Sequence, residues 1–194
     1  MLRRVAHALH RPVTNLLLRT VRSDVWDRHA FQVPIKAYGA GSSREFEWYF
    51  QGNSSIPFEG IDGMKDWLLQ CDYVPDPVHF SRRDFWQHPV MFEHRRQGDC
   101  EDFSLWAWRK LVEAGFQAEF VAGWSIRPGE TECGHTWVHL HCEGTVFVFD
   151  GVIREAGVMM RPLRDAAGEY IPQVSVDQGF QRYVYGGYRV RTHC

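Results

Sequence analysis

Three residue types that together support nucleophilic catalysis by a thiol occur in order along this sequence: Cys100, His135 and Asp150. Such chemistry requires a thiolate, a base that takes the thiol proton, and a group that holds the base in one tautomer. Cys100 lies in the run Gly98-Asp-Cys-Glu-Asp102, at the start of an apolar segment with helical spacing. His135 begins one alternating segment and Asp150 ends the next. The pattern favours a Cys-His-Asp site held by regular elements.

The element expected to carry the thiol is a helix over residues 99–114. Asp99 and Asp102 form a capping-box-like start, with Asp in place of the usual Glu or Gln, and Gly115 is a natural stop. Its apolar residues cover so much of the circumference that we expect a central helix packed on more than one side. Backbone N–H groups at its start would favour a thiolate at Cys100 and could stabilise an oxyanion.

The carboxylates around Cys100 argue both for and against this reading. Asp99, Glu101 and Asp102 crowd the thiol, and nearby negative charge raises the pKa of a thiol and opposes its activation. A cationic His135 would have to offset them. The alternative is a buried structural cysteine, a common buried residue, but three carboxylates around a purely structural thiol would be hard to explain.

The base and the orienting acid are expected on a hairpin. Alternating segments predict strands over residues 117–125, 134–142 and 145–150, with a tight turn at Glu143-Gly144. The lengths of the last two strands would place Asp150 beside the start of the first of them, where His135 lies. The alternative for Asp150 is a cap on the turn before Gly151; the register favours the catalytic role.

The strand after residue 133 also contains several metal-ligand types, which raises a rival function. Its candidate ligands are Cys133, His135, His139, His141 and Cys142. A flat strand splays these side chains over two faces, whereas a structural zinc site needs four convergent ligands. We therefore predict no metal and no other cofactor. The apolar face of this strand should pack inside, and His139 and His141 should be satisfied or exposed histidines without a catalytic role.

The remaining segments predict a simple organisation. Residues 1–60 are expected to form a helical and loop extension packed on a catalytic core of residues 61–194. Short helices are expected around Pro12 within residues 1–25, followed by loops over 26–60. A further helix, capped by Asp62 and ended by Pro75 and Pro77, should carry Met64, Trp67, Leu68 and Cys71 on one face. An irregular stretch over 78–97 and a final strand over Tyr183–Val190 complete the expected elements outside the site.

Bulk composition limits the partners. The chain has 194 residues, 44% of them hydrophobic, and a net charge of -2, so no global field favours nucleic acid. No run reaches the length of a membrane span. Five cysteines without a framework spacing argue against disulfides and for a cytoplasmic, reducing location. The first 23 residues contain five arginines and no acid, which we interpret as a surface helix rather than a targeting segment. No feature predicts an oligomeric state.

Three motifs resemble those of one known family. Gly98-Asp-Cys-Glu-Asp-Phe103, Gly134-His-Thr-Trp-Val138 and Val146-Phe-Val-Phe-Asp150 resemble the core of the transglutaminase-like superfamily, closest to the bacterial transglutaminase-like cysteine proteinases, over about residues 85–151. The resemblance implies a papain-like α+β fold in which the catalytic helix packs on an antiparallel sheet. It implies Cys100 as nucleophile, His135 as base and Asp150 as orienting acid. Thr136 replaces the family's usual Ala.

The resemblance also implies an upstream oxyanion partner, for which Gln97 and Trp86 are candidates. The predicted function is that of a cysteine peptidase or amidase acting on a peptide or amide, possibly within a protein. The alternatives are transglutaminase-type amide transfer, which shares the chemistry up to the acyl-enzyme, and a catalytically silent binding module on the same fold.

Overall fold

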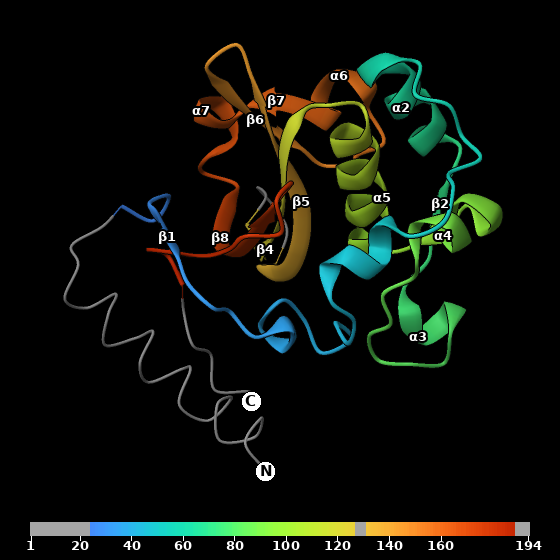
Figure 1. The fold of residues 1–194 in the computed structure, drawn as a ribbon, viewed down its shortest axis with the longest axis horizontal. Helices are drawn as coiled ribbons and strands as arrows, with labels where there is room; N and C mark the ends of the chain where they lie inside the picture. Colours follow the sequence, from blue (N-terminus) through green and yellow to red (C-terminus); the bar gives the residue numbers. More distant parts are fainter. Residues whose placement is uncertain (1–23, 127–130, 189–194) are drawn as a thin grey trace.

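The computed structural model describes residues 24–126 and 131–188, which form one antiparallel seven-stranded sheet with helices against it (Figure 1). The strand order is β1-β9-β8-β4-β5-β6-β7, and a separate parallel pair is made by β2 and β3. The expected α+β architecture is therefore confirmed. The strands are β1 (Arg28–Ala30), β2 (Asp72–Tyr73), β3 (Gln97–Gly98), β4 (Gln117–Ser125), β5 (Cys133–Cys142), β6 (Thr145–Phe149), β7 (Met160–Pro162), β8 (Tyr170–Asp177) and β9 (Arg182–Tyr185).

The helices lie mostly on one side of this sheet, with α5 directly against it and α2, α3 and α4 beyond (Figure 1). They are α2 (Gly60–Leu69), α3 (Asp76–His79), α4 (Pro89–Arg95), α5 (Cys100–Glu113), α6 (Ala156–Met159) and α7 (Leu163–Ala166), with short 3-10 turns η1 (Ile35–Ala37) and η2 (Phe46–Phe50). Within the described ranges, none of these helices combines the length and the apolar character needed to cross a bilayer.

The central helix α5 forms where the sequence predicts it. Asp99 and Asp102 make the capping box, and Gly115 follows the helix with a φ of +88°, a conformation that favours glycine. Every residue from Glu101 to Leu111 is buried, so the helix is enclosed on more than one side, as its apolar pattern indicates.

The β5–β6 hairpin also agrees with the sequence. Glu143 and Gly144 both have positive φ, at 48° and 75°, as expected of a two-residue turn that follows the twist of the strands. The register runs from Cys142 opposite Thr145 to Val138 opposite Phe149. Continued by one residue, it sets Asp150 on the return strand close to the beginning of β5.

Other residues pack against both faces of β5, whereas the sequence predicted a buried face on one side only. Val138 and Leu140 join the core beneath α5, as their apolar face suggested. Trp137, on the other face, is completely buried in a second cluster with Val121 and Tyr170. Aromatic and polar residues therefore fill the far side of the sheet, and the His-rich face of the strand is an interior surface.

Several expected boundaries were wrong. Helix α2 begins at Gly60, before Asp62, and ends at Leu69, so Cys71 is buried just beyond the helix. The stretch over 78–97 is not wholly irregular: it contains α4, which Pro89 begins as first helical residue while the His88 ring accepts a hydrogen bond from Val90 N. Strand β9 ends at Tyr185, before the glycine pair. The expectations for Pro12 and residues 1–23 lie outside the described residues.

Candidate active site

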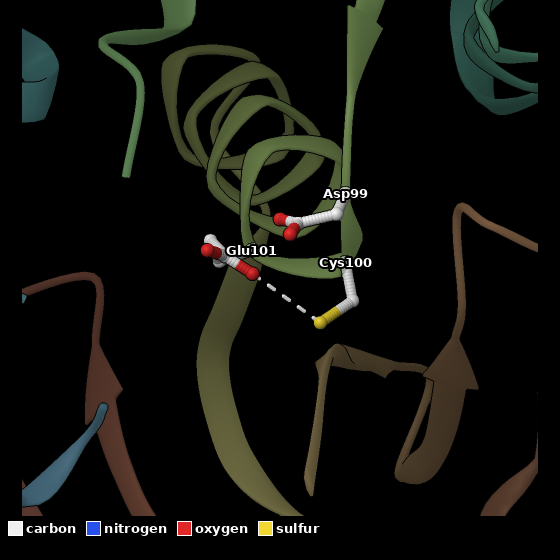
Figure 2. A group of neighbouring side chains, drawn as sticks. All are labelled: Asp99, Cys100 and Glu101. Atoms are coloured by element: carbon white, nitrogen blue, oxygen red, sulfur yellow. Dashed lines mark hydrogen bonds between the residues drawn. The ribbon is translucent and has the colours of Figure 1, made fainter. Parts of the chain in front are cut away.

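Cys100 is the first residue of α5 and follows a close backbone approach. A Cβ at Gly98 would overlap the carboxylate of Asp102, so only glycine fits before the helix. The Asp99 N–H donates to Asp102 Oδ2 at 3.3 Å. Figure 2 shows the Cys100 side chain turned toward Glu101, to whose Oε2 the thiol donates at 3.3 Å. The thiol is thus held at the helix start, half-buried and beside a carboxylate.

This environment keeps the thiol protonated. Burial raises the pKa of Cys100 well above its usual range, and the Glu101 and Asp99 carboxylates raise it further. The hydroxyl of Thr136 acts in the opposite direction and lowers the pKa. Any thiolate chemistry at Cys100 therefore needs either a base that takes the proton during attack or a reduction of the negative charge around the sulfur.

His135 and Asp150, the expected base and orienting acid, lie together as the hairpin register suggested. His135 Nε2 lies 2.8 Å from Asp150 Oδ2, and their side chains are 8% and 1% exposed. If Asp150 is ionised it only accepts hydrogen bonds, and a neutral His135 would then carry its proton on Nε2 and its lone pair on Nδ1. That is the tautomer that a base acting through Nδ1 would require.

Tyr170 and the backbone after Asp150 also hold this carboxylate. Its hydroxyl donates to Asp150 Oδ2 at 2.8 Å, and Val152 N donates to Asp150 Oδ1 at 3.3 Å. The rings of Tyr170 and His135 lie nearly parallel, with centroids 6.3 Å apart. Asp150 is therefore held by three donors and has little freedom to turn away from the imidazole.

Thr136 connects the beginning of α5, where Cys100 lies, to the strand that carries His135. Its Oγ1 lies 3.1 Å from Ser104 Oγ on α5, and its hydroxyl is near enough to Cys100 to affect the pKa of the thiol. Thr136 directly follows His135, so the first turn of α5 and the first residues of β5 are adjacent. The departure from the family's usual Ala supplies a polar contact at this junction.

Five carboxylates gather at the beginning of α5, and we call them the acidic cluster: Asp76, Asp84, Asp99, Glu101 and Asp102. Three subsets place one ligand atom from each of three residues within 4.8 Å of one another, namely Asp99 with Cys100 and Glu101, Asp76 with Asp84 and Glu101, and Asp76 with Asp99 and Asp102.

Burial without enough partners is the notable property of the acidic cluster. One oxygen each of Asp76, Asp84 and Asp99 is buried without a hydrogen-bond partner among the described residues. Burial, with smaller contributions from Asp99 and Asp84, raises the pKa of Asp76 to about 6. Burial and Asp99 raise the pKa of Glu101 well above its usual value. Oxygen ligands of this kind fit a hard divalent cation such as Ca²⁺ or Mg²⁺.

The two proposed oxyanion partners have different surroundings. Trp86 is buried, with its ring centroid 5.4 Å from that of Phe120. The amide of Gln97 donates to Asp72 Oδ2 at 3.4 Å. As oxyanion partners both stay predictions.

The side-chain amide of Gln87, which lies between Trp86 and Gln97 in the sequence, hydrogen-bonds to the first turn of α5. It is fully buried, and its Nε2 donates to Asp102 Oδ2 at 2.5 Å and to Gln97 O at 2.9 Å.

Hydrogen bonds within the protein hold the histidines in the middle and at the end of β5. His139 accepts a hydrogen bond from Trp137 Nε1 at 2.9 Å, and burial lowers the pKa of His139 to about 4, so the ring is neutral at pH 7. His141 Nε2 lies 2.9 Å from Glu119 Oε1. Arg28 forms an ion pair with the same carboxylate, and among the described residues the candidate metal groups lie around Cys100, away from this network.

Tyr170, Gln87 and Asp76 were missed by the sequence reasoning. Tyr170 begins β8, whose alternating Val174 and Val176 are a strand signal that Pro172 obscured. Asp76, between two prolines, carried no recognisable signal, because its role depends on contacts with the loop around Asp84 and Phe85 and with the start of α5.

Comparisons with known proteins give a likeness of fold. No protein-family model and no curated protein sequence matches the chain. Three solved structures of LapG from Legionella pneumophila are similar, one of them calcium-bound and one EGTA-treated, each at 20% identity and a TM-score of 0.47. They cover 67% of this chain and 71%, 71% and 69% of the LapG chain.

Proposed function

We propose that this protein is a cysteine-dependent acyl-transfer enzyme, a peptidase or amidase, in which Cys100 is the nucleophile, His135 the base and Asp150 the orienting acid. The observation that carries the proposal is the buried His135–Asp150 hydrogen bond of 2.8 Å at the start of β5. With Nε2 bonded to Asp150, Nδ1 would be the basic nitrogen, and the next residue, Thr136, hydrogen-bonds to Ser104 on the helix that begins at Cys100. A buried imidazole with a carboxylate behind it is the arrangement that activates a neighbouring nucleophile.

The reaction begins with a protonated thiol, since the pKa of Cys100 is raised. Cys100 Sγ attacks the carbonyl carbon of the substrate while His135 Nδ1 takes the thiol proton, and the carbonyl π electrons move onto oxygen. Backbone N–H groups at the first turn of α5, including that of Cys100, stabilise the oxyanion. The C–N bond then breaks as the imidazolium returns the proton to the leaving amine, which gives a thioester on Cys100.

The fate of the thioester in the second half of the reaction distinguishes hydrolysis from transamidation. Attack of water on the thioester, with His135 again as base, gives hydrolysis and restores the thiol. Attack of an amine gives transamidation by the same steps. Hydrolysis is the proposed outcome, because water needs no second binding site; a catalytically silent binding module is the remaining alternative.

We further propose that the acidic cluster holds a divalent cation. The fit is argued from the unpartnered buried oxygens of Asp76, Asp84 and Asp99 together with Glu101, since buried carboxylates without partners are costly. A bound cation would supply positive charge beside the sulfur and so lower the pKa of Cys100. Glu101, which accepts from the thiol in this structure, would instead be one of the residues that hold the cation.

The proposed chemistry is tested by turnover of a fluorogenic peptide-amide library with Cys100→Ser and His135→Ala variants. Both should lose activity by at least a hundredfold while keeping the melting temperature of the wild type within a few degrees. The matched controls are Cys142→Ser, at the opposite end of β5 from His135, and His94→Ala, an exposed histidine of α4. Retained turnover in Cys100→Ser would show that the acyl-enzyme proposal is wrong.

A further inference from the structure

The segment that leads into Cys100 carries unpaired positive charge on the surface. Arg82, Arg83, Arg95 and Arg96 are all exposed, and none of the four forms an ion pair with any residue that the structure describes. The carboxylates of this stretch do not balance them at the surface, because Asp76 and Glu93 are buried and Asp84 is half-buried. In a chain of net charge -2, such a concentration is not a general property of the surface.

Direct contacts join most of these residues into one patch. Arg95 lies over the ring of Phe80, with 5.1 Å to the centroid, and Arg82 lies over Phe85 at 4.8 Å. The two rings have centroids 4.7 Å apart, and Arg95 Nη1 is 3.4 Å from His79 Nε2. We call His79, Arg82, Arg83 and Arg95, with Phe80 and Phe85 beneath them, the arginine patch.

The aromatic base of the patch makes the arginines good ligands. Guanidinium groups that lie over rings are held in place without using their hydrogen-bond donors. A stacked arginine therefore keeps its planar fork available for a carboxylate and loses less side-chain freedom on binding. Burial and Arg95 lower the pKa of His79, which is consistent with a locally positive surface.

The patch is continuous with the proposed active site. Helix α3 begins at Asp76, whose N–H donates to Asp99 Oδ2 at 3.4 Å, next to Cys100. Helix α4 ends at Arg95, five residues before Cys100, and both short helices lie beside the first turn of α5 (Figure 1). A polypeptide that reaches Cys100 from this side would cross the patch, as well as the exposed side chains of Tyr73 and Val78, which are 49% and 76% exposed.

We propose that the arginine patch is a docking surface for an acidic segment of a protein substrate, lying beside the bond that Cys100 attacks. Calling the bound segment a substrate rests on the proposed function, but binding of an acidic peptide to the arginine patch does not depend on catalysis. A carboxylate-rich peptide is favoured over nucleic acid because the patch is short and the chain as a whole is negatively charged, whereas nucleic-acid sites have basic stripes and a high pI.

The test uses fluorescence anisotropy with the full-length protein and a labelled eight-residue peptide of Asp and Glu. The patch variant is Arg82→Gln, Arg83→Gln, Arg95→Gln. The control Arg44→Gln, Lys65→Gln, Arg164→Gln removes three positive charges elsewhere, so that both variants have the same net charge. We expect the patch variant to bind roughly tenfold more weakly than wild type, about twofold for each exposed contact, and the control to bind like wild type.

Further arms separate the possible outcomes. Added salt should weaken the binding of wild type and control. A Cys100→Ser variant that binds the peptide normally but is inactive keeps this inference and the catalytic proposal distinguishable. Equal binding by patch and control variants would overturn the inference. So would tighter, patch-dependent binding of a single-stranded oligonucleotide or of vesicles containing phosphatidylserine, which would assign the patch to another class of partner.

Discussion

Replacing Glu101 with Gln should make Cys100 more reactive toward alkylating agents. The thiol sulfur lies 3.3 Å from Glu101 Oε2. At that separation two negative charges repel by about 1.3 kcal/mol in bulk water and by about 5 kcal/mol at an effective dielectric of about 20. The smaller energy already corresponds to a roughly tenfold change in the thiolate fraction. Because burial also raises the pKa of Glu101 itself, this repulsion acts once Glu101 is ionised. Without added divalent cation, Glu101→Gln should therefore be alkylated at Cys100 at least about tenfold faster than wild type at alkaline pH.

The rate can be followed with iodoacetamide and peptide mass spectrometry, which separates Cys100 from Cys133, an exposed thiol that serves as an internal standard. Glu113→Gln is the matched control, because that carboxyl lies at the other end of α5. An unchanged Cys100 rate in Glu101→Gln would refute the statement that the neighbouring carboxylate suppresses the thiolate.

Four other expectations concern the site and its supports. Asp150→Asn should lower kcat/KM by roughly a hundredfold or more, since an amide can present the wrong group to the imidazole; the loss should exceed any loss of stability measured by denaturant unfolding. Tyr170→Phe should lower kcat by about tenfold and the free energy of unfolding by about 1 kcal/mol, as one donor to a buried carboxylate is removed; an unchanged kcat would make the hydroxyl merely structural. Chelation with EDTA should slow alkylation of Cys100, Ca²⁺ or Mg²⁺ should restore it, and Asp76→Asn should remove this response. The pKa of His139 is about 4 in the folded chain against 6.5 in a free peptide, so the unfolded state binds the extra proton and stability falls as pH drops from 6.5 to 4. Relative to a His139→Gln variant the wild type should lose up to about 3 kcal/mol over that range, and equal pH curves for the two proteins would contradict the assignment.

The helix that carries Cys100 and the hairpin that carries His135 and Asp150 were predicted because their signals are local. A capping box, a terminal glycine and an amphipathic period determine α5 within some sixteen residues. Glu143-Gly144 fixes the register of β5 and β6, and that register alone brings Asp150 toward His135. These elements needed no information from distant parts of the chain.

The parts that could not be predicted depend on long-range contacts. Strand β8 is held by pairing with β4 on one side and β9 on the other, while its own sequence contains Pro172. The acidic cluster forms only when α3, the loop around Asp84 and the start of α5 meet. Gln87 and Tyr170 likewise serve carboxylates fifteen and twenty residues away. Neither amino-acid composition nor hydrophobic periodicity indicates which acidic residues of the chain will be buried together.

The central claim, that Cys100 forms a covalent acyl-enzyme with help from His135, is tested most directly by trapping with a peptide vinyl sulfone or acyloxymethyl ketone and locating the adduct by mass spectrometry. The account predicts one adduct on Cys100 in the wild type, a rate at least a hundredfold lower in His135→Ala, and no adduct in Cys100→Ser. Equal trapping in wild type and His135→Ala, or labelling confined to Cys133, would contradict it.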